Sequence, residues 1–113
     1  TFMSTALALT RSVADERYSP SQYNLYLFYA SDGENSPSDS AATDVALKDL
    51  LGDLQYCGFL EVGSGGEGGP SSDIGKLFLQ LAADGQPTAA YRAAKADDIW
   101  GAVRHFFGQQ QAA

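Results

Sequence analysis

The chain has 113 residues, with seven Lys and Arg against fourteen Asp and Glu and a formal net charge of -7. This length allows one small domain with a modest core. The acidic balance and the scattered cations exclude nucleic-acid binding through a basic surface. Cys57 is the only cysteine, so no disulfide can form within the chain and a reducing, cytoplasmic environment is predicted. No apolar run is as long as a membrane-spanning helix, and the first residues lack the pattern of a secretory signal.

The first segments predict a helix followed by a strand. Residues 3–17 carry apolar side chains at helical spacing, which indicates an amphipathic helix. Its buried face is expected to consist of Phe2, Ala6, Leu9 and Val13. Residues 24–30 form an unbroken apolar run, which is typical of a parallel strand buried on both faces.

A second helix and a second strand follow a polar loop. Asp39 or Ser40 can cap this helix, and Asp44 and Lys48 are spaced for an i,i+4 ion pair on its exposed side. Its buried stripe is predicted to hold Leu47, Leu50, Leu51 and Leu54. Residues 56–62 then predict a buried strand.

The second half of the chain continues the alternation after a Gly-rich loop over residues 63–69. This loop lacks the Lys-Ser or Lys-Thr of a phosphate-binding P-loop. A third helix is capped by Ser71, Ser72 or Asp73. Its predicted buried residues are Ile74, Leu77, Phe78 and Leu81. A short peripheral strand is predicted over residues 88–92, and Asp97 is expected to cap a last helix. The apolar face of that helix is predicted as Ile99, Trp100, Val103, Phe106 and Phe107, and residues 108–113 are expected to fray.

The alternation of helix and strand predicts an α/β fold in which a mostly parallel sheet has helices on both faces, giving three layers. Residues 1–113 are interpreted as a single domain. The chain opens with a helix and without Met, whereas a parallel α/β unit normally opens with a strand. We therefore expect a piece of a longer protein whose first strand is missing. Such a loss would leave a sheet edge unpaired, which predicts self-association.

Asp32 is the first candidate for a functional residue. It follows directly on the strand predicted over residues 24–30, and ligands of open α/β sheets gather at the carboxyl ends of strands. Ser31 and Gly33 flank it, and Mg²⁺ accepts sparse coordination by one or two carboxylates. The alternative is a plain Ser-Asp-Gly turn in which Asp32 bonds its own backbone.

The other reactive residues each have a structural interpretation. His105 lies on the last helix and is interpreted as a surface or helix-end residue. Cys57 lies within an apolar strand, where a buried inert thiol is expected. Glu61 either faces the same rim as Asp32 or caps that end of the sheet, and the second interpretation is favoured. Thr1 can cap the first helix or offer a hydroxyl to an ion, and the pattern leaves both open.

Four segments of the chain resemble the YeaH/YhbH family of bacterial proteins linked to stress and sporulation. They are residues 1–7 (TFMSTAL), 16–35 (ERYSPSQYNLYLFYASDGEN), 56–61 (YCGFLE) and 95–107 (KADDIWGAVRHFF). The second of these is the most specific. The C-terminal part of the family looks like a von Willebrand factor A-type domain, so the resemblance implies that fold.

The resemblance also implies a metal-ion-dependent adhesion site. Thr1 matches the Thr of such a site and Asp32 matches its last Asp, while Ser31, Gly33 and Asn35 would support the loop. The Asp-x-Ser-x-Ser motif of these sites has no counterpart here, because the chain starts downstream of it. Mg²⁺ or another divalent cation is therefore implied in the intact protein and none in this fragment.

The function implied is that of a regulatory protein-binding module with no covalent chemistry, in the cytoplasm. A PrkA-type serine protein kinase or a SpoVR-like protein is the implied partner, and neither nucleic acid nor membrane is expected to bind. Two alternatives remain open from the residues. One is a metal-assisted phosphohydrolase that uses the same rim, and the other is a purely structural scaffold.

Overall fold

The computed structural model describes residues 2–63, 70 and 72–111. In chain order its helices and strands are α1 (Met3–Arg17), β1 (Tyr26–Ser31), α2 (Ser40–Leu51), β2 (Tyr56–Val62), α3 (Asp73–Ala83), β3 (Thr88–Ala93) and α4 (Ile99–Gln111). Short 3-10 turns, Pro37–Asp39 and Ala96–Asp98, precede α2 and α4. This order confirms the predicted alternation of helices and strands.

The contacts of the chain divide it into two compact units. The first comprises Thr1–Leu27 and Asn35–Cys57, and the second comprises Phe28–Glu34 and Gly58–Ala113. The first unit thus holds α1 and α2, and the second holds α3, β3 and α4. The chain passes between the units within β1, after Glu34, and again within β2.

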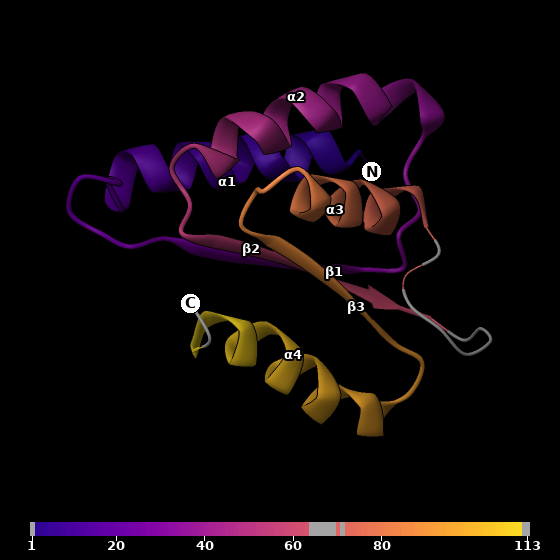
Figure 1. The fold of residues 1–113 in the computed structure, drawn as a ribbon. Helices are drawn as coiled ribbons and strands as arrows, with labels where there is room; N and C mark the ends of the chain where they lie inside the picture. Colours follow the sequence, from indigo (N-terminus) through magenta and orange to yellow (C-terminus); the bar gives the residue numbers. More distant parts are fainter. Residues whose placement is uncertain (1, 64–69, 71, 112–113) are drawn as a thin grey trace. The chain divides into compact units, whose positions relative to one another are not determined.

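The described strands form one parallel sheet in the order β1-β2-β3 (Figure 1). The bounds of β2 match the predicted residues 56–62, while β1 and β3 differ from their predicted ranges by one or two residues at their ends. A backbone hydrogen bond from the Gln55 amide to the Leu25 carbonyl, at 2.8 Å, extends the pairing of β1 and β2 toward the start of both strands.

In the first unit, α1 and α2 pack side by side (Figure 1). The helix α1 has the predicted bounds, but its predicted buried face is wrong. Met3 and Leu7 are buried, whereas Phe2, Leu9 and Val13 keep 47%, 67% and 38% of their surface exposed. The helix carries apolar residues on two adjoining faces, and spacing alone does not say which face another helix will cover.

The helix α2 follows its prediction closely. Leu47, Leu50 and Leu51 are buried, and Leu54 lies beyond the end of the helix. Lys48 Nζ lies 3.0 Å from Asp44 Oδ2, which confirms the predicted ion pair.

In the second unit, helices cover both faces of the sheet, which confirms the three-layer α/β fold (Figure 1). Consecutive residues of a strand point to opposite faces. The Phe59 ring stacks on Phe78 of α3, with centroids 5.3 Å apart. On the opposite face, a Cβ added to Gly58 would crowd Phe28 and Phe106 of α4. Glycine at residue 58 therefore lets α4 approach β2 closely.

The strand β1 is not buried on both faces, contrary to the prediction. Tyr26 and Phe28 keep 49% and 41% of their surface exposed, and the alternate residues Leu27, Tyr29 and Ser31 are only half-buried. The reason is the position of the strand. It lies at the edge of the described sheet and has only β2 as a neighbour.

The predicted apolar face of α4 is only partly buried. Ala102 and Phe106 are buried, while the other predicted residues of this face remain at least 39% exposed: Ile99, Trp100, Val103 and Phe107. The helix offers more apolar surface than its own unit covers. It continues past Gly108 to Gln111. No helix in the described part of the chain has both the length and the apolar composition needed to cross a membrane.

Candidate functional site

Asp32 follows β1 directly and is exposed to solvent. The Glu34 amide donates to Asp32 Oδ1 at 2.9 Å, and the Gly33 amide donates to Ser31 Oγ at 3.0 Å. The segment therefore forms the Ser-Asp-Gly turn that was the structural alternative for Asp32. Only one carboxylate oxygen takes part in this turn. Among the described residues, the second oxygen has no hydrogen-bond or ion-pair partner.

Gly33 fixes the position of this turn. Its φ of +84° lies in the left-handed region, which favours glycine. It is also buried against the start of α3, where an added Cβ would overlap Ser72. No larger residue fits here without moving Ser72, so the loop that carries Asp32 is held tightly at its base.

Glu61 is a buried carboxylate with a structural role near the end of β2. Its side chain is 6% exposed and accepts a hydrogen bond from the Ser72 amide at 2.9 Å. Arg92 Nε of β3 lies 3.8 Å from Glu61 Oε2. Ser72 in turn caps α3, because its Oγ accepts from the Gly75 amide at 3.0 Å. Glu61 therefore ties β2 and β3 to the start of α3, as expected of a residue that caps this end of the sheet.

Asp39 is a second buried carboxylate, and the sequence did not single it out as a site. It is the N-cap residue of α2, as predicted, but its side chain bonds other groups. Asp39 Oδ2 accepts from the Ser4 amide at 3.0 Å and from Thr43 Oγ1 at 2.9 Å, and the Ser4 hydroxyl donates to Oδ1. These hydrogen bonds, first of all that of the Ser4 hydroxyl, lower the pKa of Asp39 to about 2.

Asn35 completes this network. Its Oδ1 accepts from the Met3 amide at 3.0 Å, and its Nδ2 donates to Asp39 Oδ2 at 3.2 Å. The first turn of α1 thus receives its caps from side chains more than thirty residues away. One signal for this was present in the sequence. The residue before Met3 is Phe2, whose side chain cannot accept a hydrogen bond, so the first amides of the helix needed acceptors from elsewhere.

The remaining predicted residues have surroundings of their own or lie outside the described part. Thr1 lies outside the described residues. The ring of His105 packs against Tyr91 and Phe106, with centroids 5.2 and 5.6 Å away. Cys57 is fully buried, and burial raises the pKa of its thiol to about 12, as expected of an inert thiol.

The described residues do not by themselves form a cage for a divalent cation. Among residues 2–63, 70 and 72–111, no group of three His, Cys, Asp or Glu side chains is placed to hold a metal. Asp39 and Glu61 are both engaged by protein donors. What the described site offers is one exposed carboxylate on a turn that Gly33 holds against Ser72.

Comparison with known proteins links the chain to one family. The family model "Protein of unknown function (DUF444)" matches residues 1–110. A UPF0229 protein of Bradyrhizobium diazoefficiens is 33% identical over 98% of this chain and 27% of its own length. One from Serratia proteamaculans is 31% identical over 99% of this chain and 26% of its own length. The chain thus spans about a quarter of these relatives. No solved structure was found to match it.

Proposed function

The chain belongs to the DUF444 family, also called UPF0229, and we propose that it acts there as a regulatory protein-binding module. The resemblance to the YeaH/YhbH family is confirmed, since that is another name for the same family. Within the family-length protein we propose a von Willebrand factor A-like domain, of which this chain forms a part. The role would be regulatory, in a cytoplasmic assembly linked to stress or sporulation.

The observation that carries this proposal is the geometry of Asp32. Its backbone is fixed by Gly33, its Oδ1 closes the turn, and its second oxygen faces solvent. A carboxylate held in this way needs no rearrangement to bind a cation or a donor from a partner, which lowers the entropic cost of binding.

We propose that in the family-length protein Asp32 and Thr1 are two ligands of a divalent cation such as Mg²⁺. Mg²⁺ is commonly bound by one or two carboxylates and keeps several waters. The described residues supply one such carboxylate, so we expect further ligands from parts of the family-length protein outside the described residues and from a partner. When bound, the cation would supply a positive charge to which a partner carboxylate can attach.

The exposed apolar residues of α4 support a protein partner. Trp100 keeps 69% of its surface exposed, and Ile99, Val103 and Phe107 keep between 39% and 47%. Aromatic side chains of this kind are enriched among the residues that dominate binding energy in interfaces. The partner we propose from the family resemblance is a PrkA-type serine protein kinase or a SpoVR-like protein.

The proposal assigns no catalytic step to this chain. A hydrolase would need a general base close to Asp32. Glu61 is bound by the Ser72 amide and lies near Arg92, and the His105 ring packs between two aromatic side chains. These contacts favour binding over chemistry. Phosphatase activity of the family-length protein with a divalent metal and generic substrates would contradict this part of the proposal.

Calorimetric titration of Mg²⁺ and Mn²⁺ into the family-length protein tests the role of Asp32. The informative variant is Asp32→Asn, because the Asn oxygen can still close the turn to the Glu34 amide while the charge is lost. We expect the affinity for Mn²⁺ to fall by at least about tenfold.

The matched control is Glu34→Gln, which removes one charge two residues further on. Its cation affinity should change little. Equal binding by the Asp32→Asn variant and the unmodified protein would end the assignment of Asp32. If capture of the kinase or the SpoVR-like protein also ignored both metal and variant, the chain would be a scaffold only.

A further inference from the structure

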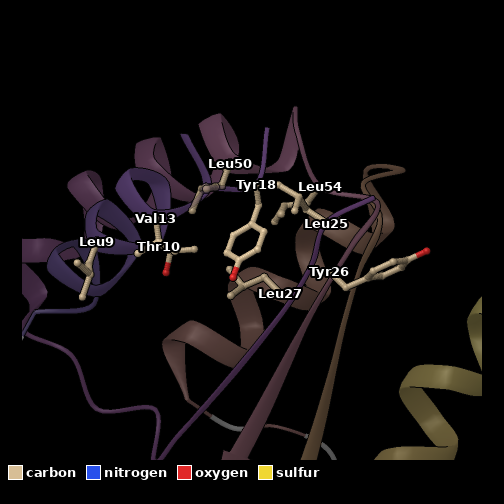
Figure 2. A pocket seen from close by; sticks show the side chains of 10 residues that line it. Leu9, Thr10, Val13, Tyr18, Leu25, Tyr26, Leu27, Leu50 and Leu54 are labelled. Carbon is tan, nitrogen blue, oxygen red and sulfur yellow. The ribbon is translucent and has the colours of Figure 1, made fainter. Parts of the chain in front are cut away.

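The first unit contains an apolar groove, and the second unit contains a polar cluster next to Asp32. The groove has a volume of about 320 Å³ (Figure 2) and is lined by Leu9, Thr10, Val13, Ala14, Tyr18, Leu25, Tyr26, Leu27, Leu50 and Leu54. None of these residues is charged, and the Thr10 hydroxyl already donates to the Ala6 carbonyl at 2.9 Å. Sites for polar ligands combine several convergent polar groups. The groove therefore gives a charged ligand little to bind, unlike the polar cluster of the second unit.

This polar cluster, here called the Glu61 cluster, consists of Gly33, Glu61, Ser72, Gly75 and Arg92, all in the second unit. Two glycine backbones converge on the same two side chains. A Cβ added to Gly33 would overlap Ser72 and lie 3.4 Å from Glu61 Oε1. A Cβ added to Gly75 would lie 3.1 Å from Glu61 Oε1 and 3.2 Å from Ser72 Oγ. Both glycines therefore pack directly against Ser72 and Glu61.

The turn that carries Asp32 depends on this packing for its position. Its own hydrogen bonds, from the Glu34 amide to Asp32 Oδ1 and from the Gly33 amide to Ser31 Oγ, each join residues two positions apart. Such local bonds fix the shape of a turn, but they do not fix where the turn lies on the protein. Asp32 and Glu34 are exposed on either side of the buried Gly33. The contact of Gly33 with Ser72 therefore fixes where the Asp32 carboxylate stands.

Ser72 is in turn held through both its backbone and its side chain. Its amide donates to Glu61 Oε1 at 2.9 Å, and Glu61 is only 4% exposed. Arg92 Nε of β3 lies 3.8 Å from Glu61 Oε2 and places an opposite charge beside this buried carboxylate. The Ser72 Oγ accepts from the Gly75 amide at 3.0 Å and caps α3. Ser72 therefore cannot move without breaking a hydrogen bond to β2 or to α3.

We propose that Ser72 is a positioning residue for Asp32 and that Glu61 acts through Ser72. The inference rests on the proposed function, because it concerns the affinity of Asp32 for a divalent cation. A site loses affinity when its ligands are free to move, since binding then has to order them. With Ser72 packed against Gly33, the Asp32 carboxylate is already in place before a cation arrives. Ser72 itself touches no ligand and acts only through the turn.

Two variants of Ser72 separate this positioning role from helix capping, because the two roles predict opposite orders. Ser72→Ala and Ser72→Gly both remove the hydroxyl that caps α3. Glycine is tolerated at an N-cap far better than alanine, so capping predicts the larger loss of stability for Ser72→Ala. Alanine keeps the Cβ that packs against Gly33, and glycine does not. Positioning therefore predicts the larger loss of cation affinity for Ser72→Gly.

Thermal unfolding of the family-length protein and calorimetric titration with Mn²⁺ measure the two orders. We expect Ser72→Ala to have the lower melting temperature and Ser72→Gly to bind Mn²⁺ on the order of tenfold more weakly than Ser72→Ala. The matched control is the pair Ser21→Ala and Ser21→Gly, which changes an exposed turn of the first unit and should leave the affinity for Mn²⁺ unchanged. Equal Mn²⁺ affinities of the two Ser72 variants, or affinities that follow their melting temperatures, would overturn the proposal.

Hydrogen exchange without metal separates failure of this inference from failure of the proposed function. The amides of Gly33 and Glu34 should exchange faster in the Ser72→Gly variant of the family-length protein than in Ser72→Ala, because the turn that protects them has lost its support. If the unmodified protein bound no Mn²⁺, the proposed cation site would fail, while this exchange order would still support the positioning of the turn by Ser72. Equal exchange of these amides in the two variants would overturn the positioning role with or without metal binding.

Discussion

The strands β1 and β2 are neighbours in one sheet and are both rich in apolar residues, yet their side chains are covered to different extents. Tyr56, Cys57 and Phe59 of β2 are at most 7% exposed, whereas Tyr26 and Phe28 of β1 are more than 40% exposed. The difference follows from position in the described sheet, where β2 has a strand on each side and β1 has a strand on one side. The burial of a strand is thus decided by its neighbours as much as by its own sequence.

The carboxylates at the ends of these strands show the same division. Glu61 of β2 is buried and accepts from the Ser72 amide, so it serves the structure. Asp32, directly after β1, is exposed and closes only its own turn. The central strand uses its carboxylate for folding, and the edge strand leaves its carboxylate accessible to a ligand.

The largest effect is expected for a Phe-to-Ala substitution in β2, compared with the same substitution in β1. Phe59 is fully buried between Tyr29 and Phe78, so Phe59→Ala should lower the free energy of unfolding by about 3–5 kcal/mol. Phe28 is 41% exposed, and Phe28→Ala should cost about 1–2 kcal/mol. Urea unfolding followed by circular dichroism measures both. Equal losses would show that β1 is as well covered as β2.

Two glycines with positive φ test how tightly the loop after β1 is held. Gly85 has a φ of +91° and open space around an added Cβ, so Gly85→Ala should cost about 1–2 kcal/mol from backbone strain alone. Gly33→Ala adds an overlap with Ser72 to the same strain and should cost at least about 1 kcal/mol more. Thermal unfolding of the two variants distinguishes the cases. A smaller loss for Gly33→Ala than for Gly85→Ala would mean that the loop moves freely.

Asp39→Asn should destabilise the first unit, because an amide cannot accept all the hydrogen bonds that the carboxylate accepts from Ser4, Asn35 and Thr43. We expect the melting temperature at pH 7 to fall by on the order of 5 °C. Asp44→Asn is the matched control, since Asp44 makes an exposed i,i+4 pair with Lys48 that contributes little.

The fall in melting temperature caused by Asp39→Asn should depend on pH with a definite sign. The pKa of Asp39 is about 2 in the folded chain, below its ordinary value near 4. The ionised side chain therefore stabilises the folded state above about pH 4, and that contribution is lost as the pH falls toward 2. The difference in melting temperature between the unmodified chain and Asp39→Asn should shrink over this range. A difference that stays constant down to pH 2 would contradict the network around Asp39.

Much of the fold was predictable from the sequence, because periodicity reports local structure. The bounds of α1 and β2 follow directly from their apolar spacing. Which face of α1 is buried did not follow, because Leu9 and Val13 are as apolar as Leu7. That choice depends on α2, more than twenty residues further along the chain. The exposure of β1 was missed for the same reason, since an edge strand and a central strand can have the same composition.

The candidate site was predictable only in its local part. The turn at Asp32 was among the alternatives weighed, because Ser-Asp-Gly bonds its own backbone. The network around Asp39 was not predicted, because it joins Ser4 to a carboxylate thirty-five residues away. A single sequence does not show which residues so far apart along the chain come together in the fold. The helix α1 begins after Phe2, whose side chain has no hydrogen-bond acceptor. This was the one local sign that the first turn of α1 needed a cap from a distant residue.

The last prediction should leave stability almost unchanged and compares the two strands by thiol reactivity. Burial raises the pKa of Cys57 to about 12, so almost none of it is thiolate at pH 8, and β2 has to open before a reagent can reach it. Ala30→Cys places a second thiol on the exposed side of β1, where an ordinary pKa near 8.5 applies. The new thiol should react with Ellman's reagent on the order of 1,000-fold faster than Cys57. Comparable rates would mean either that β2 opens readily or that β1 is covered. Hydrogen exchange of the two strands distinguishes these cases, because only the second leaves β2 protected.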